Sequence, residues 1–350
     1  DDDKIIVNNV NKNITCNFNF NVTKTLYKQI LADKTTRPGE RTNFGTALSE
    51  DNTKTLYTAT EDNTTVYYFA GNALDNWVKF GGYYWRIIRT NSDGSVRILY
   101  HGTSTTATDA YLYTSTFSTS TFRYNDKYND SMYVGYMYGT SGSLEENRTN
   151  TNNSTIKSDV DNWYRSYFTN YTKYLSTTAV YCNDRNVGSG TYSAHWDEFY
   201  YAAYTRLITN KNPTYDCSNI DDKFTVDSST GNGKLSYPIA LMTMDELAYA
   251  GGGYDFNATP WYYYNSSKTS STGTYSWWTM SPAKWYPTEL LDYAMVFMVN
   301  LLSPPNIYIS ETGVDYVDKV VLRPVISLKG NNKWKSGDGS ASNPYEIVTE

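Results

Sequence analysis

Apolar residues recur at helical spacing in three separate stretches of the chain. The clearest stretch follows Ser158 and Asp161, a pair that resembles a capping box with Asp in place of Glu. Its apolar positions fall at i, i+3, i+4, i+7, i+8 and i+11, namely Val160, Trp163, Tyr164, Tyr167, Phe168 and Tyr171. This spacing is typical of one face of an amphipathic helix, and we expect that face to pack in the core.

Two further stripes predict helices. One consists of Trp196, Tyr200, Ala203, Tyr204 and Leu207. The other begins at Thr243, where Glu246 completes a capping box, and it ends at Gly251. A helix-like piece also covers residues 25–33. We expect the stripes to serve packing rather than chemistry.

Alternating apolar and polar positions, bounded by turn residues, predict strands toward both ends of the chain. Residues 83–89 and 95–101 flank the turn Asn91-Ser92-Asp93-Gly94, which predicts a β-hairpin. Further strands are predicted at residues 275–279, 294–300, 307–310 and 320–328. Strands at both ends with helices between them predict an α+β fold of small mixed or antiparallel sheets, in which the hairpin shares a sheet with the last strand.

The chain divides into three parts that differ in amino-acid composition. Residues 1–4 resemble the tail of a cleavable epitope tag, and we expect the natural chain to continue upstream, where an anchor would lie. Residues 5–64 are rich in Asn, Thr and Lys and are interpreted as an extended lead-in segment, because they have few large apolar residues. Residues 65–350 are interpreted as one domain, with loops and short strands over 102–153.

The amino-acid composition argues against two classes of interaction, nucleic-acid binding and membrane insertion. Aromatic residues reach 16% of the chain, and these rings favour sheet structure and exposed aromatic surface. The net charge is -6 and the 30 Lys and Arg residues are scattered, so we do not expect a nucleic-acid partner. The longest mainly apolar run, residues 290–302, is too short for a membrane span.

The three cysteines leave two possibilities open. Cys182 and Cys217 flank a region rich in Tyr, Asn and Asp, and a disulfide between them would stabilise the fold by about 3 to 4 kcal/mol. Two unpaired thiols are the alternative. If the disulfide forms, Cys16 is left over near the beginning of the given sequence.

The sequence contains no arrangement typical of a catalytic or metal site. His101 and His195 are far apart, and no nucleophile elbow, P-loop or dinucleotide fingerprint occurs. Residues 227–234 have the Asp, Asn and Gly of a calcium loop but lack its distal Glu. We therefore expect no enzymatic activity, no cofactor and no metal ion.

Two short phrases near the C-terminus carry a resemblance to a known family. The clause W-W-T-x-S-P begins at Trp277, an irregular segment follows, and the phrase "VVLRPVISLK" then spans residues 320–329. This order resembles the C-terminal half of the C-type lectin-like fold, in the variant shared by formylglycine-generating enzymes and the variable proteins of diversity-generating retroelements. Phrases such as "FGGYYWRIIRTNSDGSVRILY" also resemble secreted or surface-anchored proteins of gut-type Gram-positive bacteria. The resemblance covers residues 65–350.

The resemblance implies roles for the residues around these phrases. Trp278 and Arg323 would hold the scaffold, and the segment at about 277–323 would supply the ligand-binding surface. Mixed rings and charges are also what binding hot spots use. The candidate ligand-binding residues are Trp277, Lys284, Trp285, Tyr286, Glu289, Asp292, Tyr293, Phe297, Asn300, Asn306 and Tyr308.

Two departures limit what the resemblance implies. The oxidases of the formylglycine type need a cysteine pair in the C-terminal module, and no cysteine follows Cys217. Calcium-dependent lectins use Glu-Pro-Asn or Gln-Pro-Asp with Trp-Asn-Asp, and neither form occurs. We therefore expect a non-enzymatic, extracellular binding protein of the bacterial cell surface, an adhesin or variable receptor with a protein or glycan ligand.

Two alternatives stay open. The aromatic run at residues 261–264 would suit a calcium-independent carbohydrate-binding module, because aromatic ring faces stack on sugars. The lead-in segment would suit a structural subunit of a pilus or surface layer.

Overall fold

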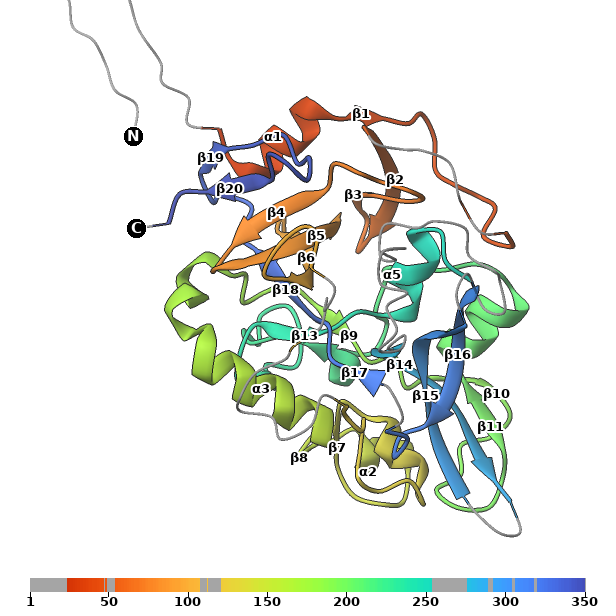
Figure 1. Cartoon of the computed structure of the whole chain (residues 1–350). Coiled ribbons are helices and arrows are strands. Elements are labelled where there is room, and N and C mark those ends of the chain that lie inside the picture. Colours follow the sequence, from red (N-terminus) through yellow and green to blue (C-terminus); the bar gives the residue numbers. More distant parts are fainter. Residues whose placement is uncertain are drawn as a thin grey trace, which may run out of the picture.

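The computed structural model describes residues 24–46, 48, 54–107, 112, 121–253, 276–288, 292–303, 306–317 and 320–349. They form an α+β fold, as the sequence predicts (Figure 1). The helices are α1 (Leu26–Asp33), α2 (Leu144–Asn147), α3 (Thr155–Tyr167), α4 (Ala202–Tyr204) and α5 (Met244–Tyr249). Short 3-10 or π turns cover Ser131–Val134, Thr169–Tyr174, Thr205–Thr209 and Ile220–Asp222.

Ten strands form the larger sheet of the described part of the chain. Its main path runs β1-β2-β3-β5-β4-β20-β19, and β6, β18 and β13 continue it from β5. The strands are β1 (Thr35–Thr36), β2 (Thr55–Glu61), β3 (Thr64–Tyr68), β4 (Trp77–Phe80), β5 (Tyr83–Thr90), β6 (Val96–Gly102), β13 (Ile239–Leu241), β18 (Pro324–Leu328), β19 (Trp334–Ser336) and β20 (Tyr345–Ile347). Most pairs are antiparallel, and β1 with β2 and β4 with β20 are parallel.

The predicted hairpin and its sheet partner are confirmed. Strands β5 and β6 pair through Ile87 and Ile98, and the turn between them closes with Gly94 N donating to Asn91 O over 2.9 Å. Gly94 has φ +78°, a conformation that glycine adopts without strain. On the other side of β6, Ile98 pairs with Ile326 of β18. The hairpin therefore shares a sheet with the last predicted strand.

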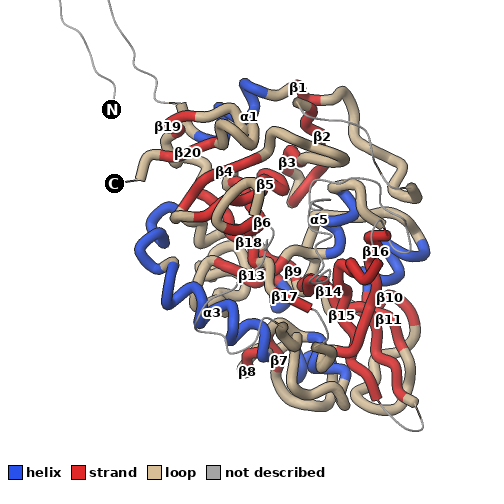
Figure 2. The backbone as a smooth tube through the Cα atoms, in the orientation of Figure 1, coloured by secondary structure: helices blue, strands red, loops and turns tan. Residues whose placement is uncertain are grey.

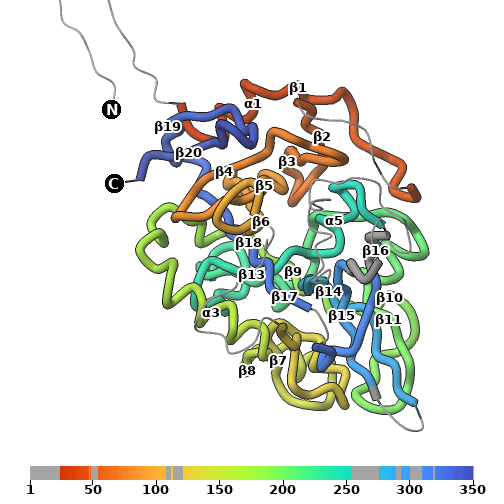
Figure 3. Tube along the Cα trace, viewed as in Figure 1, coloured from red at the N-terminus to blue at the C-terminus, as the bar shows by residue number. Residues whose placement is uncertain are grey.

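The described residues between 24 and 64 pack in the same core as the strands that follow, and no break in the sheet lies at the boundary expected at residue 65. Strands β2 and β3 form a hairpin across that position, with positive φ at Asp62 and Asn63, as in two-residue hairpin turns. Leu26 and Ile30 of α1 are buried in the main apolar cluster. Figure 3 shows the two ends of the described chain side by side, with α1 next to β19 and β20.

Two of the three predicted amphipathic helices are confirmed. Helix α3 buries Val160, Trp163 and Tyr164, although it begins earlier than expected, at a cap where the Ser154 side chain accepts from Lys157 N. Helix α5 has the predicted capping box, in which the Thr243 side chain and Glu246 each accept a backbone N–H of the other. Figure 2 shows α3 running along one side of the strands.

The helix predicted over residues 196–207 is wrong. Trp196 lies in a loop, Phe199 and Tyr201 are buried in a strand, and only Ala202–Tyr204 is α-helical before a π turn. The strand forms because Tyr200 pairs with Lys284 of a neighbouring strand. Long-range strand pairing thus overrides the helical spacing of the apolar residues.

A second sheet of six strands lies beside α5 (Figure 1). Its order is β10-β11-β14-β15-β16, and β17 runs parallel to β14. The strands are β10 (Val187–Ser189), β11 (Phe199–Tyr201), β14 (Ser276–Pro287), β15 (Asp292–Ser303), β16 (Asn306–Gly313) and β17 (Val320–Val321). Two small pairs complete the strands, β7 (Met137–Tyr138) with β8 (Asn152–Asn153) and β9 (Tyr181–Cys182) with β12 (Lys223–Phe224).

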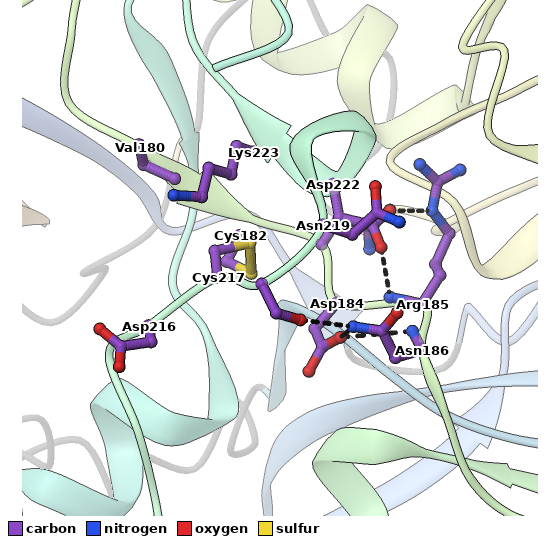
Figure 4. Close-up of a disulfide and its surroundings, with 12 residues drawn as sticks. Val180, Cys182, Asp184, Arg185, Asn186, Asp216, Cys217, Asn219, Asp222 and Lys223 are labelled. Atoms are coloured by element: carbon purple, nitrogen blue, oxygen red, sulfur yellow. Dashed lines mark hydrogen bonds and ion pairs between the residues drawn. A yellow bond between two sulfur atoms is a disulfide. The ribbon is translucent and has the colours of Figure 1, made fainter. Parts of the chain in front are cut away.

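Cys182 and Cys217 form a disulfide, which decides between the two possibilities that the sequence left open (Figure 4). The bond joins β9 to the segment that leads into β12. Beside it, the buried carboxylate of Asp222 accepts from Arg185 over 2.6 Å and from Arg148 over 2.9 Å. Covalent and ionic contacts therefore hold this irregular region together.

A buried ionic cluster joins the larger sheet to α5. Glu246 Oε1 accepts from Arg97 over 2.5 Å and from Arg89 over 3.0 Å. Arg89 also bonds Glu61 of β2 over 2.8 Å. The side chains are almost completely buried, so removing one partner would leave a charge without compensation, at a cost of about 3 to 5 kcal/mol.

None of the described helices has both the length and the apolar character needed to cross a bilayer.

Because of this ionic cluster, we expect the free energy of unfolding to fall in acid. Burial alone would raise the pKa of Glu246, but Arg97 and Arg89 hold it below its ordinary value. Because the folded state has the lower pKa, ionised Glu246 stabilises the fold above the unfolded-state value of about 4.3, and this stability is lost as the pH falls through the folded-state pKa. Urea unfolding across a pH series should show the decline, and Glu246→Gln should unfold more easily near neutral pH and lose part of the pH dependence.

Glu145→Gln is the matched control, because Glu145 is exposed in α2. Its unfolding free energy should follow that of the unmodified chain at each pH. Equal pH profiles for the Glu246→Gln and Glu145→Gln variants would contradict the assignment.

Candidate functional site

Strand alternation sorts the residues of β14 and β15 onto two faces. Lys284 pairs with Met295 and Tyr286 pairs with Tyr293, so these four side chains lie on one face of the sheet. Trp285 pairs with Ala294 and lies on the opposite face. The first face is half-buried or exposed, whereas Trp285 and Ala294 are fully buried. Burial therefore alternates from one residue to the next along residues 284–286 and 293–295, although the sequence looks irregular.

We call the partly exposed face the aromatic surface. It extends from Tyr200 on β11 to Glu311 on β16, because Tyr200 pairs with Lys284 and Glu311 pairs with Phe297 in register. Its members are Tyr200, Lys284, Tyr286, Tyr293, Met295 and Glu311. The surface thus combines three phenol rings, a thioether and one pair of opposite charges.

Lys284 lies at the centre of this surface. Its Nζ is 3.3 Å from Glu311 Oε1, and the two side chains are only 16% and 11% exposed. The same ammonium lies 5.0 Å from the ring centre of Tyr286 and 5.9 Å from that of Tyr200, which is within cation–π range. These contacts restrain a long side chain that would otherwise be mobile.

Neighbouring rings hold the tyrosines in place. The rings of Tyr128 and Tyr293 are stacked at 5.8 Å. A side chain at Gly313 would meet the Tyr293 ring at 3.1 Å, so the glycine leaves room for that ring. Tyr200 donates to Glu198 over 2.6 Å, and this hydrogen bond to the neutral phenol raises the pKa of Tyr200 to about 12. The phenol is therefore a neutral donor near pH 7.

Trp196 lies in the loop before β11, whereas its helical spacing predicts a core position. It is 85% exposed, on the loop between β10 and β11. Because Phe199 pairs with Trp285, the loop that precedes Phe199 lies at the end of β14 that carries Tyr286. The run Ser193-Ala194-His195-Trp196, with its small and polar residues, was the sequence signal for a loop.

The loop that carries Trp196 is anchored on both sides. Ser193 Oγ accepts the backbone N–H groups of Trp196 and Asp197 over 2.9 and 3.2 Å. Ser131 N donates to Ala194 O over 3.2 Å. The indole is thus presented to solvent by an ordered loop, which limits the entropy lost when a partner binds.

Three of the candidate binding residues belong to the core, and their expected exposure is wrong. Trp285 and Trp277 lie among buried residues of the main cluster, at 0% and 2% exposed. Phe297 lies in register with the aromatic surface but is 0% exposed, because the Tyr204 ring stacks on it at 6.0 Å. The sequence does not reveal this cover, since Tyr204 belongs to a distant segment.

Lys284, Tyr286 and Tyr293 are the expected binding residues that the structure brings together. Glu289 lies outside the described residues, as does the aromatic run at 261–264. Four other candidates lie in strands β15 and β16, but their side chains are outside the description: Asp292, Asn300, Asn306 and Tyr308.

The two residues assigned to the scaffold are buried and bonded to distant segments. Trp278 Nε1 donates to Phe122 O over 2.8 Å. Arg323 donates to Tyr100 O over 3.2 Å, and its guanidinium lies 4.6 Å from the ring centre of Trp277. Trp277 is therefore part of the frame rather than of the binding surface.

No group of three or more His, Cys, Asp or Glu side chains is placed to hold a metal ion within the described ranges. Comparisons with known proteins give no match: no family model, curated protein or solved structure resembles the chain at a significant level.

The two faces of β14 predict opposite effects for neighbouring substitutions. Trp285→Ala should lower the free energy of unfolding by about 3 to 5 kcal/mol, because it leaves a large cavity in the core. Tyr286→Ala should change it by no more than about 0.5 kcal/mol, since the ring is 39% exposed. Urea unfolding of both variants checks this, and a larger loss for Tyr286→Ala would reverse the assignment of faces.

Proposed function

We propose that this protein is a non-enzymatic, extracellular binding protein, an adhesin or variable receptor of the bacterial cell surface. It recognises a macromolecular partner, a protein or a glycan, through the aromatic surface. The observation that carries the proposal is the position of Lys284, Tyr286 and Tyr293 on one partly exposed face of β14 and β15. Exposed rings next to a restrained charge are typical of binding hot spots.

We propose no catalytic role because the two carboxylates that arginines hold most closely, Glu246 and Asp222, are buried. Glu246 and Asp222 are held by arginines in the interior, where they stabilise the fold. The phenol of Tyr200 donates its hydrogen bond to Glu198. The groups of the aromatic surface are thus suited to contact a partner through rings and hydrogen bonds.

The C-type lectin-like scaffold, of the kind found in variable proteins of diversity-generating retroelements, is part of the proposal. It is supported by the frame around this segment, because Trp278 precedes β15 and β16 in the chain, Arg323 follows them, and both are bonded to distant backbone carbonyls. Such a frame tolerates substitution on the outward face, because the outward side chains contribute little to the core.

A carbohydrate-binding module is the second candidate, and the exposure of Trp196 favours it. An indole in solvent can stack on the apolar face of a sugar, and nearby Ser193, Asp197 and Glu198 can accept or donate hydrogen bonds to its hydroxyls. In this case Trp196 and the aromatic surface would form one contact area for a glycan.

The proposal predicts which exposed tyrosine matters for binding. The chain would be tested on immobilised mucin, extracellular-matrix proteins and a glycan array, with Tyr286→Ala compared with Tyr167→Ala. The two tyrosines are 39% and 38% exposed, but Tyr167 lies on α3, away from the six-stranded sheet (Figure 1). We expect at least a 10-fold weaker affinity for Tyr286→Ala and no change for Tyr167→Ala.

The outcomes separate the candidates. A glycan ligand whose binding survives chelation and is lost in Trp196→Ala favours the carbohydrate module. A protein ligand lost in Tyr286→Ala favours the adhesin or receptor. Equal binding by the Tyr286→Ala and Tyr167→Ala variants would exclude the aromatic surface.

Natural variation provides an independent prediction. Among sibling sequences from the same strain population, differences between residues 278 and 323 should concentrate at alternate positions, especially Lys284, Tyr286, Tyr293 and Met295. Trp285 and Ala294 should be preserved, because they pack in the core. Sequencing of the sibling genes checks this, and equal variation on both faces would argue against diversification for binding.

A further inference from the structure

Lys34 and Asp75 form an isolated ionic contact in the interior, at the place where the two ends of the described chain meet. The Lys34 Nζ is 2.6 Å from Asp75 Oδ2, and the side chains are 2% and 7% exposed. Lys34 follows α1, Asp75 lies in the turn before β4, and Asp338, whose carbonyl also accepts from Lys34 over 2.9 Å, lies before β20. The contact thus joins three separate segments.

The hydrogen bonds around this pair do not satisfy two full charges. Among the described residues, the ammonium of Lys34 has two acceptors for its three N–H groups, Asp75 Oδ2 and Asp338 O. Asp75 Oδ1 is buried and has no hydrogen-bond partner. An incompletely bonded pair of buried charges is costly, because neither ion recovers the hydration that it loses.

The surroundings disfavour the charged form of Asp75. Burial raises the pKa of Asp75, and the hydrogen bond and charge of Lys34 offset only part of that effect. The ring of Tyr345 lies 5.5 Å from the Lys34 Nζ, within cation–π range, and this contact holds the end of the Lys34 side chain next to Asp75. Proton transfer from the ammonium to the carboxylate would leave a neutral amine in contact with a neutral acid.

We propose that Lys34 and Asp75 condense to an intramolecular amide in the folded chain. The lone pair of Nζ attacks Cγ of the protonated carboxyl group, one Cγ–O bond breaks, and the departing oxygen takes two hydrogens and leaves as water. Ammonium and carboxylate therefore become one amide and one water, and the step needs no oxidant, reductant or other reactant. The remaining N–H of the amide donates to Asp338 O, and the two charges of this pair are gone.

The other close pairs of the described chain differ in solvent access. The Lys157 Nζ is also 2.6 Å from Asp161 Oδ2, but the two residues lie on neighbouring turns of α3, and the Asp161 side chain is 13% exposed. Lys335 and Glu346 are 2.9 Å apart, and their side chains are 60% and 26% exposed. Both control carboxylates are thus more exposed than that of Asp75, at 7%, which favours the separate ions. They serve as internal controls for the amide between Lys34 and Asp75.

Such an amide would covalently join the segment after α1 to the turn before β4. The linked residues are 41 positions apart, so the crosslink closes a long loop and restricts the unfolded chain. It would also resist forces that pull α1 away from the larger sheet, which suits a protein displayed on a surface. The inference stands independently of the aromatic surface and its ligand.

The test is the intact mass of the purified full chain, unfolded and with its disulfide reduced. The unmodified chain should be lighter than its sequence mass by one water molecule. Lys34→Arg keeps the charge but cannot form this amide, and Asp75→Ala removes the carboxyl group. Both variants should have their full sequence masses. The mass of the unmodified chain is decisive even if a variant folds poorly.

Peptide mapping separates the amide from other losses of water. Asp93-Gly94 and Asp338-Gly339 can cyclise to succinimides, which have the same mass deficit. That deficit would persist in Lys34→Arg, whereas the amide would disappear. Digestion should yield one joined pair of peptides that contains Lys34 and Asp75. A full mass for the unmodified chain, or a deficit that maps to any other site, overturns the proposal.

Discussion

The carboxylate of Glu246 is the contact on which the arrangement of the two sheets depends. One oxygen accepts from Arg89 and Arg97 of the β5–β6 hairpin, and the other accepts the backbone N–H of Thr243 at the start of α5. From the same turn, Met244 N donates to Ser281 Oγ of β14. A single buried anion thus connects the larger sheet to the helix that supports the smaller one.

This arrangement explains how the fold can carry the irregular segment of β14 and β15. The inner face of β14 and β15 contributes Trp285, Ala294 and Val296 to the core. On the outer face, Lys284, Tyr286 and Tyr293 stay partly exposed, whereas Phe297 is covered by Tyr204. Side chains on the outer face are restrained by one another, through the contacts of Lys284 with Glu311 and Tyr286. The same two strands therefore carry buried side chains that hold the fold and exposed side chains that can be substituted.

The proposed amide and the observed disulfide would act on different parts of the molecule. The disulfide holds the irregular segments around β9 and β12. The pair of Lys34 and Asp75 lies where α1 meets the larger sheet, next to the C-terminal strands. Each would link segments that are more than 30 residues apart in the sequence.

The sequence by itself determined the elements that depend on local interactions. These were the α+β class, the hairpin turn at Asn91–Gly94, the stripe of α3 and the capping box of α5, because caps, turns and helical periodicity involve residues close in the chain. Only the tertiary structure decided the rest. Pairing of Tyr200 with Lys284 made a strand of residues with helical spacing, Tyr204 covered Phe297, and the register of β14 turned Trp285 inward and Tyr286 outward. These outcomes depend on contacts between segments far apart in sequence, which no local pattern records.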